Sequence, residues 1–287
     1  MHSHGADPAV ATTEPDRCAA VQKAVKHPSR LPPWAFGETS CDVLEERACE
    51  IGGITVHYRV AGSGHPAVLV HGLAGSWRWW KPVAEELAQH MQVYLVDLPG
   101  FGSARGRPFV LGDAPSYVRA LLSEVGLERV TLVGHSLGGA VCARVAALWP
   151  DAVDRLVLVA PAGLLERRRP IQYAVPIAAA LRHARPRFLR VAASDSLRAG
   201  LVTVYRAGTQ LLDDDALRRE LSSIQAPTLL LWGERDPIVR PRLAREYEGA
   251  ITGAKLVVLA GAGHVPMSDQ PDAFAAALLE FLARRAE

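Results

Sequence analysis

Cysteine is scarce in this sequence, and its four copies carry none of the spacings that mark a metal or redox site. Cys18, Cys41, Cys49 and Cys142 include no CxxC pair, and histidines do not gather around them. A zinc site and a redox dithiol are therefore not indicated, and we expect no metal. We interpret the chain as intracellular, with a disulfide between Cys41 and Cys49 as the alternative.

An excess of charge of one sign is also lacking. The chain has 32 Lys and Arg against 30 Asp and Glu, a net charge of +2 at pH 7. Binding to nucleic acid requires a dominant basic stripe, so nucleic acid is not an expected partner. Hydrophobic residues make up 49% and charged residues 22%, the balance of an ordered globular protein.

Long apolar runs are missing as well. The longest uncharged candidate, residues 171–181, is interrupted by Pro176 and is too short to span a bilayer. Residues 1–10 contain two histidines and Asp7 but no apolar stretch that would direct secretion. We expect a cytoplasmic protein without a membrane span. No pattern in the sequence indicates an oligomeric state.

From about residue 43, short apolar runs rich in β-branched residues alternate with helical patterns. Residues 43–51 and 54–60 flank Gly52-Gly53, which predicts a β-hairpin. Further buried strands are expected at 67–70, 93–96, 130–133, 156–159, 228–232 and 255–259. Helices are expected at 79–90, 114–125, 137–149, 241–250 and 273–285. This alternation predicts an α/β fold with a doubly wound, mostly parallel sheet.

Two segments depart from this alternation. Residues 1–42 are rich in proline and charge without a sustained period, and we expect a loosely ordered N-terminal extension. Residues 162–226 separate two expected strands and have a helical pattern broken by prolines. We interpret them as a helical cap inserted into a core formed by residues 43–161 and 227–287.

A candidate nucleophile lies in Gly134-His135-Ser136-Leu137-Gly138, between an expected strand and an expected helix. Glycines two positions before and after the serine allow a sharp turn without a clash against a Cβ atom. Such a turn holds the Ser136 hydroxyl at the carboxyl end of the sheet, over a helix N-terminus. We therefore predict Ser136 as the nucleophile.

A serine hydroxyl is a weak nucleophile until a base takes its proton. Among ten histidines, His264 follows the last expected strand in a glycine-containing loop, at the same edge of the sheet as Ser136. His135 is adjacent to the serine, so its side chain is expected to point elsewhere, and His71 is expected to hold its own loop. We predict His264 as the base.

The base needs an acid that orients its ring and stabilises the imidazolium. Asp236 lies just past the strand 228–232, again at the carboxyl edge. Glu234 is the main rival, and Asp97 also follows a strand but precedes the serine. The strand 156–159 has no acid at its end, which favours Asp236.

An oxyanion intermediate requires backbone N–H donors near the nucleophile. Leu137 supplies one because it begins the helix after Ser136. The loop at 71–75 follows the strand 67–70, and Leu73 within it is the best candidate for the second donor.

In the chain order Ser136, Asp236, His264, these residues and their settings resemble the α/β-hydrolase family. Matching motifs are His71-Gly72, Asp97-Leu-Pro-Gly-Phe-Gly102, Gly134 to Gly138, Gly233 to Asp236 and Gly263-His264-Val-Pro266. The resemblance covers about residues 45–285 and implies that the helical cap lies over the substrate pocket. Serine at position 136 argues against the epoxide hydrolase and haloalkane dehalogenase branches, which need a carboxylate nucleophile.

The cap is rich in arginine, with seven between residues 166 and 190 against Glu166 alone. An anionic substrate or attraction to an acidic surface is one interpretation. A solvated helix face is the alternative.

Three tryptophans follow the loop at 71–75. Trp77 either lines an acyl pocket or packs on the sheet, whereas Trp79 and Trp80 are expected in the core. Trp77 is thus one candidate for substrate binding, and His135, the neighbour of Ser136 in the sequence, is the other.

The resulting hypothesis is a serine hydrolase that cleaves carboxylic esters of small to medium acyl chains through an acyl-enzyme, without a metal or organic cofactor. Its partner is a small-molecule ester. The same residues also suit a thioesterase, a lactonase, a carbon–carbon bond hydrolase or a perhydrolase, and acyl transfer to an alcohol stays open. A ligand receptor on a hydrolase scaffold is the alternative outside the enzymes.

Overall fold

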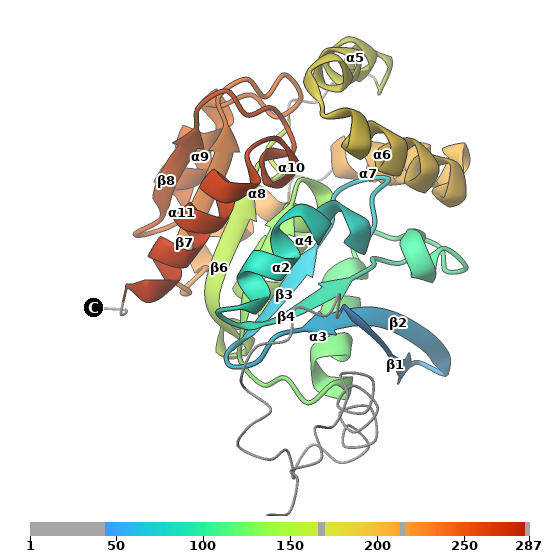
Figure 1. The fold of residues 1–287 in the computed structure, drawn as a ribbon, viewed down its shortest axis with the longest axis vertical. Coiled ribbons are helices and arrows are strands. Elements are labelled where there is room, and N and C mark those ends of the chain that lie inside the picture. Colours follow the sequence, from blue (N-terminus) through green and yellow to red (C-terminus); the bar gives the residue numbers. More distant parts are fainter. Residues whose placement is uncertain (1–43, 166–169, 213–215, 285–287) are drawn as a thin grey trace, which may run out of the picture. The chain divides into compact units, whose positions relative to one another are not determined.

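The computed structural model describes residues 44–165, 170–212 and 216–284, and Figure 1 shows their arrangement. The expected N-terminal extension, and with it Cys18 and Cys41, lies outside these residues. An eight-stranded sheet has the order β1-β2-β4-β3-β5-β6-β7-β8. The strands are β1 Glu45–Ile51, β2 Ile54–Ala61, β3 Pro66–Val70, β4 Gln92–Val96, β5 Val130–His135, β6 Val153–Val159, β7 Thr228–Gly233 and β8 Lys255–Leu259.

The β1–β2 and β2–β4 pairs are antiparallel, and every other pair in this sheet is parallel. The prediction of a doubly wound, mostly parallel sheet is therefore confirmed. Gly52 and Gly53 join β1 to β2 with φ of 58° and 73°, values that suit a two-residue hairpin turn and that other residues rarely adopt.

The central strands are buried on both faces. Val68 and Leu132 point into one apolar cluster, whereas Leu69 and Val133 point into the other. This alternation explains why the strands read as continuous apolar runs. The first face is covered by α3 Ala114–Glu124, α4 Leu137–Leu148 and α9 Arg242–Ala250. The second face is covered by α2 Lys81–Ala88 and α11 Pro271–Ala283.

The expected helix at 79–90 has a different start from the one predicted. A short 3-10 helix, η2 Trp77–Trp80, precedes α2, and Pro82 lies in the first turn of α2. The Ser76 hydroxyl accepts the Arg78 N–H and caps η2.

A helical segment separates β6 from β7. It contains η5 Pro170–Tyr173, α5 Ala174–His183, α6 Pro186–Ala199, α7 Leu201–Leu212 and α8 Ala216–Glu220. Figure 1 shows α5, α6 and α7 gathered at one end of the sheet. Within the described ranges, no helix has both the length and the apolar character needed to cross a membrane.

Candidate active site

The turn that carries Ser136 is strained and tightly packed. Ser136 has φ 51° and ψ −113°, a conformation that a non-glycine residue adopts only when its surroundings hold it there. Its N–H donates to the carbonyl of Val159 at 2.9 Å. A Cβ atom on Gly134 would lie 2.7 Å from Cys142 Sγ, and one on Gly138 would overlap the carbonyl oxygens of Val70 and His71. Both glycines are therefore required by close approach of the backbone.

The structure brings Ser136, His264 and Asp236 into one chain of hydrogen bonds. His264 Nε2 lies 3.1 Å from Ser136 Oγ, and His264 Nδ1 lies 2.7 Å from Asp236 Oδ2. All three side chains are buried. Since the Nδ1 position faces a carboxylate, the proton sits there and leaves Nε2 free to accept the serine proton.

The backbone holds the Asp236 carboxylate in place. Its Oδ1 accepts the N–H groups of Ile238 at 2.8 Å and Val239 at 3.0 Å, which leaves Oδ2 for the histidine. Glu234, the sequence rival, instead accepts the N–H of Gly261 at 2.9 Å. Geometry thus favours Asp236 as the partner of the histidine.

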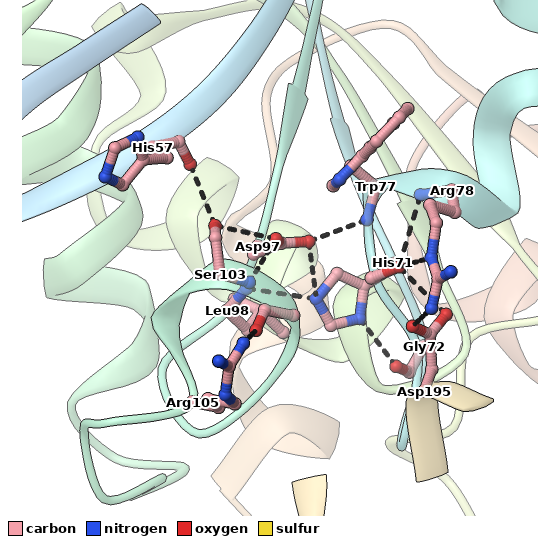
Figure 2. Close-up of polar contacts among 12 residues, drawn as sticks. His57, His71, Gly72, Trp77, Arg78, Asp97, Leu98, Ser103, Arg105 and Asp195 are labelled. Carbon is pink, nitrogen blue, oxygen red and sulfur yellow. Dashed lines mark hydrogen bonds and ion pairs between the residues drawn. The ribbon is translucent and has the colours of Figure 1, made fainter. Parts of the chain in front are cut away.

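The second rival, Asp97, is buried and belongs to a separate hydrogen-bond network near His71, which Figure 2 shows. Asp97 accepts the N–H of Trp77 at 2.6 Å and both the N–H and hydroxyl of Ser103 at 2.7 and 2.8 Å. His71 Nε2 accepts the N–H of Leu98 at 3.0 Å, so the proton of this ring is on Nδ1.

His71 Nδ1 donates in turn to the carbonyl oxygen of Gly72 at 2.7 Å. Burial lowers the pKa of His71 and favours the neutral ring. This agrees with the predicted role of His71 in holding its loop.

The two backbone donors proposed from the sequence are Leu137 and Leu73, and each lies at a turn of the chain. Leu137 is the first residue of α4, and Leu73 precedes Ala74, whose φ is 61°. Within the described part of the chain, neither N–H donates to a protein acceptor. Both Leu73 and Ser136 line the same cavity, so the amides remain candidates for holding an oxyanion.

His135 lies against the base rather than away from the site. Its Nε2 donates to the backbone carbonyl of His264 at 2.8 Å, and the two rings are 4.9 Å apart. Burial lowers the pKa of His135 well below its ordinary value, and the neighbouring His264 acts in the same direction. A neutral His135 therefore supports the loop that carries His264 while also lining the cavity.

A cavity of about 600 Å³ opens over Ser136, within the size range that holds drug-sized ligands. Among the described residues, no Asp, Glu, Lys or Arg lines it. Its wall includes Trp79, His135, His264, Tyr173, Ile177, Leu181, Leu189, Ala192, Ser196, Val204, Tyr205, Gly208 and Leu211. Helices α5, α6 and α7 thus supply half of the residues of a largely apolar wall.

The tryptophan expectation needs correcting. Trp79 is buried in the core, as expected, but it also lines the cavity, which Trp77 does not. Trp77 packs against the core, the second alternative given for it, and lies beneath the Arg59 guanidinium at 4.9 Å from the ring centroid. Residues two apart in η2 point to different sides, so only one of the pair can reach the site. Trp80 is fully buried in the core, as expected.

The arginines that the structure describes between residues 170 and 190 do not line the cavity. Arg182, Arg185, Arg187 and Arg190 are exposed, and none of them lines the wall. The residues Glu166 to Arg169 lie outside the described part. An anionic substrate held by these four arginines is therefore not supported by the geometry.

One buried acid escaped the sequence reasoning. Asp195 of α6 accepts the hydroxyl of Ser76, the N-cap of η2, at 2.8 Å. It also forms an ion pair with Arg78 within η2 (Figure 2). This cluster ties the cavity wall to the core. A lone acid between two serines in an arginine-rich segment was the available signal, but its partners lie more than 110 residues away in the sequence.

No metal chemistry is indicated by the side chains that the structure describes, since no group of three or more His, Cys, Asp or Glu there is arranged to hold an ion. The buried Cys142 packs in the core, and burial raises the pKa of its thiol well above the ordinary value.

Known proteins resemble the chain over most of its length. A pimeloyl-[acyl-carrier protein] methyl ester esterase of Nitrosospira multiformis is 29% identical over 266 residues, covering 80% of this chain and 99% of that protein. A 2-hydroxy-6-oxo-6-(2'-aminophenyl)hexa-2,4-dienoic acid hydrolase of Metapseudomonas resinovorans is 28% identical over 285 residues, with 88% and 96% covered.

Among solved structures, a membrane phospholipase A superposes with a TM-score of 0.74 at 24% identity, covering 93% of this chain and 91% of that one. At this identity the match supports the fold alone. The model of the alpha/beta hydrolase family matches residues 67–277, which include Ser136, Asp236 and His264. The chain belongs to the alpha/beta hydrolase family.

Proposed function

We propose that this protein is a serine hydrolase that cleaves carboxylic esters with uncharged acyl groups. The hydrogen-bond chain from Asp236 through His264 to Ser136, buried at the floor of an apolar cavity, carries the proposal. A relative named as a methyl ester esterase supports ester cleavage.

In the proposed reaction, Ser136 Oγ attacks the ester carbonyl while His264 Nε2 takes the hydroxyl proton. Asp236 stabilises the imidazolium that forms, and the N–H groups of Leu73 and Leu137 donate to the oxyanion. The C–O bond then breaks, and His264 delivers the proton to the leaving alcohol. Water, deprotonated by His264, attacks the acyl-enzyme and frees the acid and Ser136.

The cavity supports an uncharged acyl group because no ionic side chain of the described residues lines its wall. A carboxylate placed there would lose its hydration without gaining a cationic partner, which is costly. The carbon–carbon hydrolase alternative, to which a relative named as a dienoic acid hydrolase points, would need a cationic partner for that carboxylate. The helical segment between β6 and β7 would act as the cap that bounds this cavity.

The test is turnover of p-nitrophenyl esters from acetate to palmitate by the wild type and Ser136→Ala. We expect the wild type to prefer a medium chain, and the alanine variant to lose at least about 10³-fold in kcat/KM. Parallel assays with a thioester, a lactone and a vinylogous 1,5-diketone acid separate the alternatives. Equal, slow turnover of the esters by both proteins would reject the proposal.

A further inference from the structure

Large apolar side chains stand exposed on the helices that bound the cavity. Of the eleven large hydrophobic residues exposed in the described part, seven belong to α5, α6 and α7. Val175, Leu197, Leu201, Val202 and Tyr205 are each between 62% and 82% exposed. Four of them follow one another closely in the sequence across the junction of α6 and α7. Exposure of several large apolar side chains in one segment is typical of a surface that contacts another apolar phase. We call these five residues the apolar face.

The exposed charges that the structure describes on α5, α6 and α7 are of one sign. Between Pro170 and Leu212, the exposed charged side chains are all arginines, namely Arg182, Arg185, Arg187, Arg190, Arg198 and Arg206. The one acid of this stretch, Asp195, is buried and paired with Arg78. The segment therefore presents apolar and positive side chains together, although the whole chain carries a net charge of only +2.

The entrance to the cavity lies within the same helices. Ile177, Leu181 and Tyr205 line the cavity and are also among the exposed hydrophobics. A residue that meets both conditions lies at the rim of the opening. An apolar path therefore runs from the surface of α5 and α7 to Ser136.

From this arrangement we propose that α5, α6 and α7 form a docking surface for an anionic lipid membrane, from which an apolar ester enters the cavity. Helices with apolar side chains beside arginines bind at the boundary of headgroups and acyl chains, and arginine stems reach the phosphates while covering apolar surface. Anionic headgroups complement the six arginines.

The positive charge of this surface also argues against a second copy of the chain as its partner. A two-fold dimer sets the same patch against itself, which would bring six arginines from each copy together at a cost. Docking on lipid is independent of the proposed esterase activity, whereas entry of the substrate from lipid rests on it.

The experiment is co-sedimentation of the full chain, as Ser136→Ala so that nothing is hydrolysed, with phosphatidylcholine vesicles with and without phosphatidylglycerol. We expect binding to the anionic vesicles that falls sharply when salt is raised to about 1 M, where the Debye length is about 3 Å. Binding to neutral vesicles should be at least tenfold weaker.

Two paired variants assign the surface. Arg187→Gln with Arg190→Gln should weaken binding about fivefold per arginine, and Leu201→Ser with Val202→Ser should weaken it at least fivefold. The matched controls change the same chemistry elsewhere: Arg245→Gln with Arg284→Gln, and the exposed Leu148→Ser. They should bind like the parent, and thermal melting verifies that every variant is folded.

The proposal is overturned if the anionic vesicles do not retain the protein, or if the control variants lose as much binding as the variants on the apolar face. It is also overturned if light scattering shows a dimer that Leu201→Ser with Val202→Ser dissociates. Because binding is read in the Ser136→Ala background, failure of the ester assay and failure of lipid docking are distinguished.

Discussion

The edge of the sheet at Ser136 and the helices α5 to α7 enclose the same cavity but differ in how tightly their residues are packed. At the edge, a strained turn is held by backbone contacts that leave no room for a Cβ atom on Gly138. On the helices, half-buried side chains line the cavity and large apolar ones remain in solvent. From this comparison we infer that the tightly packed edge, called the rigid region below, carries the chemistry. We infer likewise that the helices, called the adaptable region, select the substrate.

The largest effect is expected from changing the acid of the rigid region. Asp236→Asn presents an amide to His264 Nδ1, which favours the tautomer that cannot accept the serine proton. We expect kcat to fall about 10⁴-fold, about 5 kcal/mol in the barrier, while thermal stability changes little. Steady-state kinetics with a p-nitrophenyl ester measures it.

Glu234→Gln is the matched control, because within the described ranges that carboxylate accepts the Gly261 N–H and has no hydrogen bond to the base. Its kcat should remain within a few-fold of the wild type. A comparable loss in both variants would contradict the assignment of Asp236.

Replacing a glycine by alanine should lower the free energy of unfolding in the rigid region and raise it in the adaptable region. Gly138→Ala places a Cβ atom onto the carbonyl oxygens of Val70 and His71, and should lower the free energy of unfolding by about 2–3 kcal/mol. Gly208→Ala lies within α7, where the added Cβ meets only Leu73 at 3.7 Å. It should raise the free energy of unfolding by about 0.5–1 kcal/mol. Urea unfolding measures both, and a loss in each would erase the contrast.

Filling the cavity from the helical side should alter selectivity without altering the chemistry. Ala192 of α6 lines the cavity, and Ala192→Phe should lower kcat/KM for medium-chain esters about tenfold while sparing acetate. Arg187→Gln lies on the same helix outside the wall and should keep the wild-type profile. An unchanged profile in Ala192→Phe would show that acyl chains lie elsewhere.

The smallest effect concerns pH. Burial holds the pKa of His135 well below 6.5, so below that pH the unfolded chain binds a proton that the folded chain does not. Stability therefore falls as pH drops through about 6.5, and His135 contributes up to about 1.4 kcal/mol per pH unit to the slope. His135→Gln should reduce the slope in urea unfolding between about pH 6 and 5, and an unchanged slope would contradict it.

Much of the rigid region was predictable because its constraints are local. Strands buried on both faces produce apolar runs, and the glycines around Ser136 report the close approach of β3 to α4. The order of strands and chemistry-bearing loops then brings Ser136, Asp236 and His264 to one edge.

The adaptable region was less predictable, because helical periodicity does not reveal what a helix packs against. The same pattern fits a buried wall and an exposed face, so the cavity residues of α5 to α7 could not be chosen from sequence. The pairing of Asp195 with Arg78 depends on tertiary contact, and so does the position of Trp79, rather than Trp77, at the cavity wall.

The central claim is that the buried contact between His264 and Ser136 activates that one serine. Intact-mass analysis and peptide mapping after treatment with diisopropyl fluorophosphate test it most directly, since the reagent phosphorylates an activated serine and needs no knowledge of the substrate. We predict a single adduct on Ser136, absent from Ser136→Ala and strongly slowed in Asp236→Asn. An adduct on another serine, or equal labelling of Ser136→Ala, would contradict the account.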